Sequence, residues 1–132
     1  MINTYDNTSD LRTELAGILV LLEKVYDEDL DVLVNRFLKC INQWDYKLDI
    51  LKDSSYVTLG ICLYKPDGNM YTGDIIRIDT LVVKDQGLGH GSELLKKFAY
   101  KNIQLECHVD NLEGQKFYEA RNFIRRTYSY VR

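Results

Sequence analysis

The residues best suited to chemistry lie between positions 84 and 92, where three glycines alternate with other residues. Gly87, Gly89 and Gly91 follow an apolar run and directly precede a segment of helical periodicity. Glycines at such a junction let the backbone approach a ligand closely, and the first N–H groups of a helix have no intrahelical partner. The spacing therefore predicts a strand, a tight loop and a helix N-terminus that together bind an anion such as a phosphate.

Details of this segment exclude two common phosphate-binding loops. No Gly-Lys-Ser/Thr sequence closes it, as an NTPase phosphate loop requires. Gly91 comes two residues after Gly89, whereas the dinucleotide-binding fingerprint places its third glycine three residues after the second. The pattern that is present is Gln/Arg-x-x-Gly-x-Gly/Ala, carried by Gln86, Gly89 and Gly91.

A second motif begins about 20 residues beyond the loop, after a predicted strand. Its positions are Asn111, Gly114, Phe117, Tyr118, Asn122 and Phe123. The two motifs together, in this order, resemble the GNAT family of N-acetyltransferases, which bind acetyl-CoA. The resemblance covers about residues 56–132, and the first 45 residues match only in being helical.

Three departures from the family pattern are visible. Gly114 and Asn122 stand where the family more often has Ala and Gly, and both replacements are small or tolerate a left-handed backbone. The segment between Val83 and Gln86 is about two residues shorter than in many members. The resemblance therefore fixes the position of the loop against the cofactor better than the register of the preceding strand.

The resemblance implies an α/β (α+β) fold in one domain, residues 1–132. It implies the GNAT acyl-CoA N-acyltransferase fold: a central mixed, mostly antiparallel sheet flanked by helices, with two parallel strands that splay apart. Residues 1–45 would form a helical region on the side of the acceptor, and residues 56–132 the core that binds acetyl-CoA.

The resemblance also implies how the cofactor is held. Loop N–H groups would bind the pyrophosphate, pantetheine would lie between residues 81–83 and 107–109, and an N–H near residues 81–83 would polarise the acetyl carbonyl. The Asn111 side chain either contacts the cofactor, as the resemblance implies, or caps the following helix. The implied cofactor-binding residues are Leu81, Val82, Val83, Gln86, Gly87, Leu88, Gly89, His90, Gly91, Ser92, Asn111 and Tyr118.

In this family an amine attacks the thioester directly, without an acyl-enzyme. Tyr118 occupies the position of the family's general acid, and a phenol pKa near 10 is close to that of a thiol; the alternative is a partly buried core tyrosine. The general base is open among Asp79, Glu106 and His108, with a water relay as a further alternative. Lys84, Lys96 and Lys97 either reach cofactor phosphates or are ordinary exposed lysines, and no metal site is indicated.

The periodicity of the first half predicts the elements that position these residues. Helices are expected over about 11–25, with Ser9 or Asp10 as N-cap, and over about 30–44. Strands are expected over 2–5, 46–50, 56–64 and 75–83, with turns at 53–55 and 66–69 and residues 70–72 as the start of a returning strand.

The second half predicts a helix over about 89–100, a strand over 103–109, a helix to about residue 120 and a final strand over 123–131. Asp110 and Glu113 form a capping-box-like start for the last helix, and Asn122 suits the left-handed residue that ends it. A strand, a helix and a strand in succession predict a parallel pair with a right-handed crossover.

Composition narrows the class of partner. The net charge is −3, which argues against a nucleic-acid binder, and no apolar run approaches the roughly 20 residues of a membrane span. Residues 1–31 carry eight acidic and two basic side chains, which favours a cationic acceptor. Cys40, Cys62 and Cys107 lack metal-ligand spacing and suit reduced thiols in a cytoplasmic protein.

We therefore expect an acetyl-CoA-dependent N-acetyltransferase that acts on a primary amine of a small molecule or a peptide. A homodimer is compatible with this expectation. The alternative is a non-catalytic module that senses acetyl-CoA and acts on a partner protein.

Overall fold

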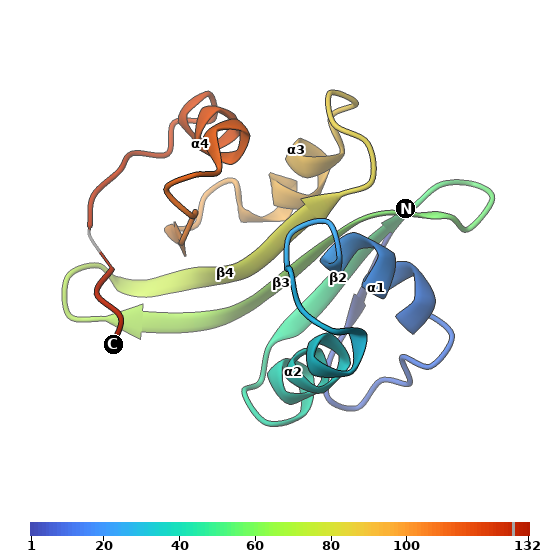
Figure 1. The fold of residues 1–132 in the computed structure, drawn as a ribbon. Coiled ribbons are helices and arrows are strands. Elements are labelled where there is room, and N and C mark those ends of the chain that lie inside the picture. The colour runs from blue at the N-terminus through green and yellow to red at the C-terminus, as the bar shows by residue number, and fades with distance from the viewer. Residues whose placement is uncertain (128) are drawn as a thin grey trace.

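The computed structural model describes residues 1–127 and 129–132, and a five-stranded sheet forms its centre (Figure 1). The strands lie across the sheet in chain order: β1 (Ile2–Tyr5), β2 (Lys47–Lys52), β3 (Thr58–Asn69), β4 (Gly73–Val83) and β5 (Ile103–Leu105). The first four strands pair antiparallel, and β4 pairs parallel with β5. The mixed, mostly antiparallel sheet predicted from the sequence is confirmed.

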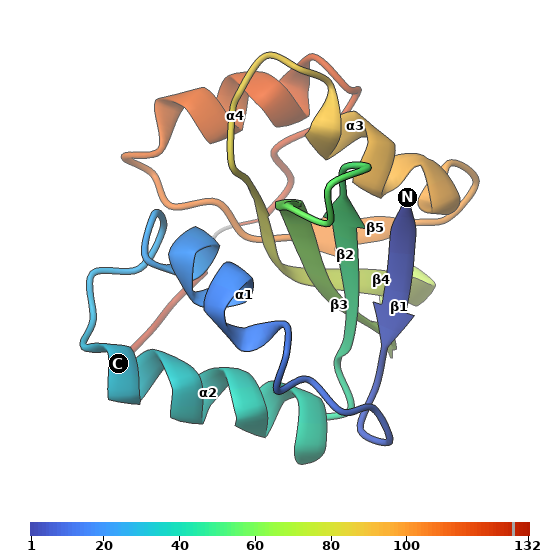
Figure 2. The same ribbon diagram turned by 90° about the vertical axis from the view of Figure 1, so that its right-hand side faces the viewer.

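Helices cover both faces of this sheet (Figure 2). One face carries α1 (Leu15–Leu22) and α2 (Leu30–Asn42). The other carries α3 (His90–Leu95), the 3₁₀ turn η1 (Lys96–Phe98) and α4 (Leu112–Glu119). Successive strand residues point to opposite faces, so the sheet separates two apolar cores. No helix in the described residues is both long enough and apolar enough to cross a membrane.

Helix α1 is shorter than the predicted 11–25, whereas α2 agrees with its prediction. Neither Ser9 nor Asp10 is the N-cap, because the N-cap position falls at Glu14. The Asp10 carboxylate instead accepts hydrogen bonds from the backbone N–H and the guanidinium of Arg12 at 2.7–3.2 Å, and the Ser9 hydroxyl accepts one from the N–H of Asp6 at 3.0 Å. The chain forms turns over 12–14, and the α-helix begins only at Leu15. Glu14 at the N-cap position binds Lys52 of β2 at 2.6 Å, which ties the helix start to the sheet.

The turn predicted at residues 66–69 is wrong, because β3 continues through them to Asn69. Beyond Tyr64 no β2 residue pairs with β3, so Pro66, which lacks an N–H, lies in a stretch with only one partner strand. The reversal comes at residues 70–72, where the Asn69 side chain accepts hydrogen bonds from the N–H groups of Tyr71 and Thr72, both at 2.9 Å.

The C-terminal third departs most from the prediction. The helix expected over 89–100 is divided into α3 and η1, and β5 ends at Leu105 instead of residue 109. Asn111 is the N-cap of α4 instead of Asp110, and Asn122 has the expected left-handed backbone, with φ of 67°. Residues 123–127 and 129–131 form no strand, so the predicted final strand is absent from the described residues; Tyr128 lies outside them.

Candidate active site

The parallel strands β4 and β5 separate after three residue pairs. Pairing runs from Ile76↔Ile103 to Ile78↔Leu105 and then stops. Beyond this point the chain leaves β5 toward α4, while β4 continues to Val83 (Figure 1). The last five residues of β4 therefore have an open edge on the β5 side, as the predicted splay requires.

The backbone of β4 directs hydrogen-bonding groups into this opening. The N–H of Lys84 donates to the carbonyl of Leu59 in β3 at 2.8 Å. Since hydrogen-bonded and non-hydrogen-bonded residues alternate in an antiparallel ladder, the N–H and C=O of Val83 point away from β3. The same alternation directs Leu81 to the open edge. These groups can pair with an extended, amide-containing ligand.

Asp79 is an extra residue in β4 at the start of the splay. Leu63 of β3 pairs with Thr80, and Tyr64 pairs with Ile78, so Asp79 has no partner in β3. Such a β-bulge redirects a side chain and increases the local twist. It places a carboxylate at the point where the two parallel strands separate.

Charged and polar groups surround the Asp79 carboxylate. The surrounding protein atoms desolvate the carboxylate and raise its pKa, although the residue is solvent-accessible. A hydrogen bond from Thr80 at 3.5 Å lowers the pKa and the charge of Glu106 raises it, so the net change is an increase. The Thr80 hydroxyl also lies 2.7 Å from the Tyr26 hydroxyl. Burial is the main cause of the raised pKa of Tyr26, Cys40 and Tyr46, and negative charge on Asp79 contributes to each increase. Asp79 is thus a carboxylate with increased affinity for a proton, beside the α1–α2 connection and α2.

Tyr118 lies on α4, close enough to Cys107, Cys62 and Tyr26 for their charges to act on it. Its half-buried ring packs edge-on against Phe117 and Phe123, with ring centroids 5.3 and 5.5 Å apart. Burial raises the pKa of Tyr118 to about 12, and Cys107, Cys62 and Tyr26 contribute to the increase. The phenol therefore carries its proton throughout the neutral and mildly alkaline range.

The glycine loop, residues 84–89, connects the open end of β4 to α3. Gly87 and Gly89 have φ of 82° and 79°, a backbone region that side chains disfavour. Residues 84–89 are exposed, whereas His90 is half-buried, and its Nδ1 atom is buried without a hydrogen-bond partner among the described residues. Ser92 accepts a hydrogen bond from Arg121 at 2.8 Å. The loop thus has the backbone geometry and exposure that an anion site requires.

Gly91 serves a packing role that the motif does not reveal. A Cβ atom at this buried position would lie 2.8 Å from Cζ and 3.0 Å from Cε2 of Phe117. The close approach joins the first turn of α3 to α4, the helix that carries Tyr118. Phe117 is partly buried and packs against the core beneath α3, and the guanidinium of Arg121 stacks 3.6 Å from its ring centroid.

We expect Gly91→Ala to destabilise the protein by about 1–3 kcal/mol, the usual cost of overpacking. The added methyl group must displace the Phe117 ring, and thermal or urea unfolding measures the loss. Gly91→Ala/Phe117→Leu should lose less stability than the two single changes together, because leucine removes the atoms in conflict. Strict additivity would contradict a steric origin.

The structure does not bring every predicted residue into the opening. His108 is 75% exposed; its Nδ1 accepts a hydrogen bond from the N–H of Asp110 at 3.2 Å and lies 3.6 Å from the Asp110 carboxylate. Asn111 accepts a hydrogen bond from the N–H of Gly114 at 2.9 Å, which favours its role as a cap. Glu106 lies near enough for its charge to act on Asp79. Thr80 beside Asp79, and Tyr26 beside Thr80, belong to no motif of the sequence.

Lys97 is directed away from the loop into a buried network. Its ammonium lies 3.1 Å from the carboxylate of Asp49, which is completely buried, and donates to the Tyr64 hydroxyl at 2.8 Å. Thr4 also donates to Asp49 at 2.7 Å. Desolvation lowers the pKa of Lys97, but its hydrogen bonds to Tyr64 and Asp49 raise it more. The network links β1, β2, β3 and η1 and leaves Lys97 unsuited to contact a cofactor phosphate.

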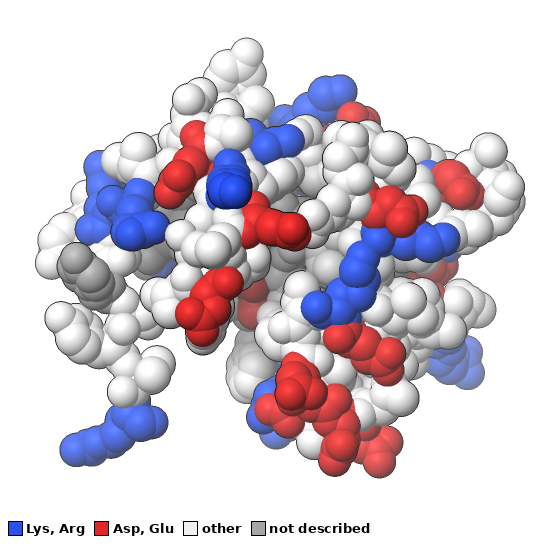
Figure 3. Space-filling view, turned by 45° about the horizontal axis from the view of Figure 1, so that its top comes forward, with Lys and Arg blue, Asp and Glu red and all other residues white. Residues whose placement is uncertain are grey.

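Charge is distributed unevenly around the opening. Asp27, Glu28 and Asp29 of the α1–α2 connection are exposed. Figure 3 shows a dense acidic group at its lower edge and basic side chains at its left, with a hollowed surface between them. Among the described residues, no three His, Cys, Asp or Glu side chains are placed to hold a metal ion.

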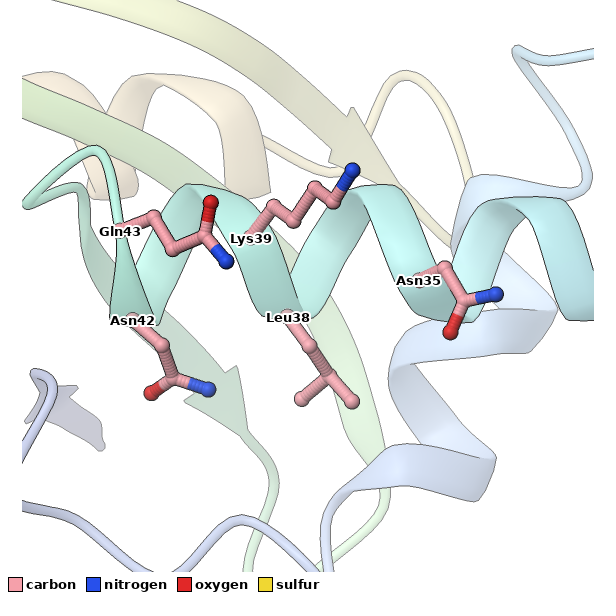
Figure 4. Close-up of a pocket in the computed structure, with 5 residues that line it drawn as sticks. All are labelled: Asn35, Leu38, Lys39, Asn42 and Gln43. Carbon is pink, nitrogen blue, oxygen red and sulfur yellow. The ribbon is translucent and has the colours of Figure 1, made fainter.

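A shallow depression lies elsewhere, on the outer side of α2 and its C-cap. It is lined by Asn35, Leu38, Lys39, Asn42 and Gln43 (Figure 4). These side chains come from one helical segment and point to different sides of it. The depression is therefore a feature of the helix surface, separate from the β4–β5 opening.

No known family profile matches the sequence, and no curated protein matches it significantly. Solved structures do match over the whole chain. The apo aminoglycoside 6'-N-acetyltransferase AAC(6')-Ig of Acinetobacter haemolyticus has a TM-score of 0.78 at 10% identity, with coverage of 100% of this chain and 97% of the other. An integron cassette protein from the V. cholerae mobile metagenome has a TM-score of 0.78 at 20% identity, with 100% and 90% coverage.

The aminoglycoside N-acetyltransferase AAC(6')-Iy, solved in complex with CoA, has a TM-score of 0.76 at 15% identity and covers 100% of this chain and 93% of its own. At identities this low, the structural likeness establishes the fold alone, and the activity has to be argued from the site. The splayed parallel pair, the glycine loop and the helices on both faces fit the same architecture. The chain therefore has the GNAT acyltransferase fold.

Proposed function

We propose that this protein transfers the acetyl group of acetyl-CoA to a primary amine. The observation that carries the proposal is the opening between β4 and β5, which joins an open strand edge, an exposed glycine loop, a bulged carboxylate and a protonated phenol. Acetyltransferases of the same fold, one of them solved with CoA, support the choice of cofactor and reaction.

The proposed binding mode follows from the chemistry of the two partners. Pantetheine contains two amides, which suit the outward N–H and C=O groups of Leu81 and the outward N–H of Val83, whose C=O accepts from Lys24. Val82 pairs with Ile61 and packs in the α1–α2 core, so it does not face the pantetheine. The N–H groups of the loop, including that of His90, suit the pyrophosphate. The loop residues in this role are Gln86, Gly87, Leu88, Gly89, His90, Gly91 and Ser92.

In the proposed reaction the amine nitrogen attacks the thioester carbon. The acceptor ammonium first loses one proton to Asp79, directly or through water, so that the nitrogen is free to attack; a C–N bond then forms, the C–S bond breaks, and the second proton leaves the nitrogen for solvent. The phenol of Tyr118 donates its proton to the departing sulfur, and both groups then exchange protons with solvent. Glu106 keeps the site negative and so favours an ammonium acceptor.

The acceptor would approach from the side of residues 1–45. Tyr26 and Thr80 border Asp79 there, and the acidic α1–α2 connection lies close to the same end of β4. A cationic small-molecule or peptide amine suits this environment through charge complementarity.

Two measurements test the proposal. Calorimetric titration or thermal shift with acetyl-CoA should detect binding, and absence of stabilisation at millimolar cofactor contradicts the cofactor assignment. Thiol release in the presence of a panel of primary amines should detect turnover. Binding without turnover on any amine would favour the acetyl-CoA sensor over the enzyme.

We expect Asp79→Asn to lower kcat/KM by about 10²-fold or more, because the amide cannot accept the amine proton. In the wild type, kcat/KM should fall with decreasing pH as Asp79 becomes protonated, at a pKa above the usual carboxyl value of about 3.9. This acidic limb should be lost in the variant. Asp74→Asn, at an exposed position of the same strand, is the control; equal rates for the two variants would exclude Asp79 as the base.

A further inference from the structure

A lysine from the helical N-terminal region lies at the entrance to the glycine loop. The ammonium of Lys24 donates to the carbonyl of Val83 at 3.0 Å and to that of Lys84. Lys24 follows α1, and its two acceptors are the last residue of β4 and the first of the loop. The contact spans 59 residues of sequence and fixes a cation on the open edge of β4.

The geometry leaves this cation able to bind a further acceptor. An ammonium group has three donors, and the two carbonyls take two of them. The two carbonyl oxygens alone would repel an anion that approached the loop. The ammonium neutralises them and has one further N–H to donate.

We infer that Lys24 is a cofactor-binding residue that donates to the nucleotide phosphates of the acyl donor. The inference rests on the proposed function, because the cofactor orientation follows from it: pantetheine along β4 and pyrophosphate at the loop place the first phosphate near residues 83–84. The helical region then takes part in holding the donor as well as the acceptor. Asp85 and Lys84 are the neighbouring charged residues on the loop, and both are exposed.

The test compares two acyl donors that differ in their phosphates. S-acetylpantetheine has the thioester and both amides of acetyl-CoA but no phosphate. Lys24→Met should weaken acetyl-CoA binding by about tenfold, the scale of one lost charge-assisted hydrogen bond. It should change the affinity for S-acetylpantetheine by less than about twofold, and Lys24→Arg should retain most of the acetyl-CoA affinity.

Lys101→Met is the matched control, because Lys101 is exposed and lies beyond η1, at the far end from the loop. Wild-type binding of acetyl-CoA should also weaken with salt more steeply than that of Lys24→Met. An equal loss for both donors would identify Lys24 as a structural tie only, and unchanged binding of both would also overturn the inference. A wild-type protein that binds neither donor contradicts the proposed function itself, a result distinct from these two.

Discussion

Tyr118→Phe is expected to lower kcat/KM by about 100-fold or more, the usual contribution of a positioned general acid. The change removes only the hydroxyl, so the ring contacts with Phe117 and Phe123 and the affinity for acetyl-CoA should persist. Because burial raises the pKa of Tyr118 to about 12, the phenol is protonated throughout pH 6–10, and the ratio of wild-type to variant rates should stay constant there. Steady-state thiol release with the best amine of the panel measures kcat/KM for both proteins.

The control for this prediction is Tyr100→Phe, at a fully exposed tyrosine on the loop after η1. It should have wild-type activity. If Tyr118→Phe also turns over at the wild-type rate, Tyr118 is a core tyrosine and another donor protonates the thiolate. A raised pKa makes the phenol a weaker acid toward a thiolate, so its proton transfer must be concerted with C–S cleavage to be effective.

Lys97→Met is expected to cause the largest loss of stability, about 2–3 kcal/mol. Removing one partner of a buried ion pair costs about 3–5 kcal/mol. The loss expected here is smaller than that range because the Lys97 side chain is 41% exposed. Asp49, with no exposed surface, would keep only its bonds to Thr4 and Tyr64. Urea unfolding at neutral pH measures the difference.

The pH dependence of the stabilisation by Lys97 follows from the direction in which its pKa is shifted. The pKa of Lys97 is raised in the folded protein, so its stabilisation is fully present below about pH 10.4, the unfolded value, and is lost as pH rises through the folded value. The difference between wild type and Lys97→Met should therefore be constant in the neutral range and decrease in strong alkali.

Two variants check the origin of this effect. Lys96→Met removes the same charge from an exposed lysine that pairs with Glu93 at 3.2 Å, and it should change stability by less than about 0.5 kcal/mol. Asp49→Asn/Lys97→Met should be more stable than Lys97→Met, because no charge remains buried alone. A Lys97→Met protein as stable as Lys96→Met would contradict the buried-pair account.

Local patterns were sufficient to predict much of the fold. The order of helices and strands, the parallel β4–β5 pair and the left-handed Asn122 follow from periodicity and from the conformational preferences of single residues. The prediction of a turn at residues 66–69 was wrong because Pro and Gly occur in turns and also in strands that have a partner strand on one side only. Strand β5 is short because its pairing stops where β4 has its extra residue Asp79, which the alternating sequence of β5 does not record.

The candidate site was predictable only where its residues form a motif. Gln86 to Gly91 and Tyr118 belong to short patterns in the sequence. Tyr26 contacts Thr80 across 54 residues, and Lys24 contacts Val83 across 59, so no local signal marks either one. The ion pair of Lys97 with Asp49 is equally long-range, and Lys97 alone resembles any exposed helix lysine.

The bulge at Asp79 has a consequence for the whole of β4. Before it, Ile76 and Ile78 face the α3 core; after it, Leu81 and Val83 face that core, and Val82 has moved to the α1–α2 core. The apolar spacing 76, 78, 81, 83 thus contains one step of three residues, which shifts the phase of the strand by half a period. Deleting Asp79 would make the spacing regular with the same apolar side chains on each face, so the bulge adds a carboxylate at the splay without changing which residues the two cores receive.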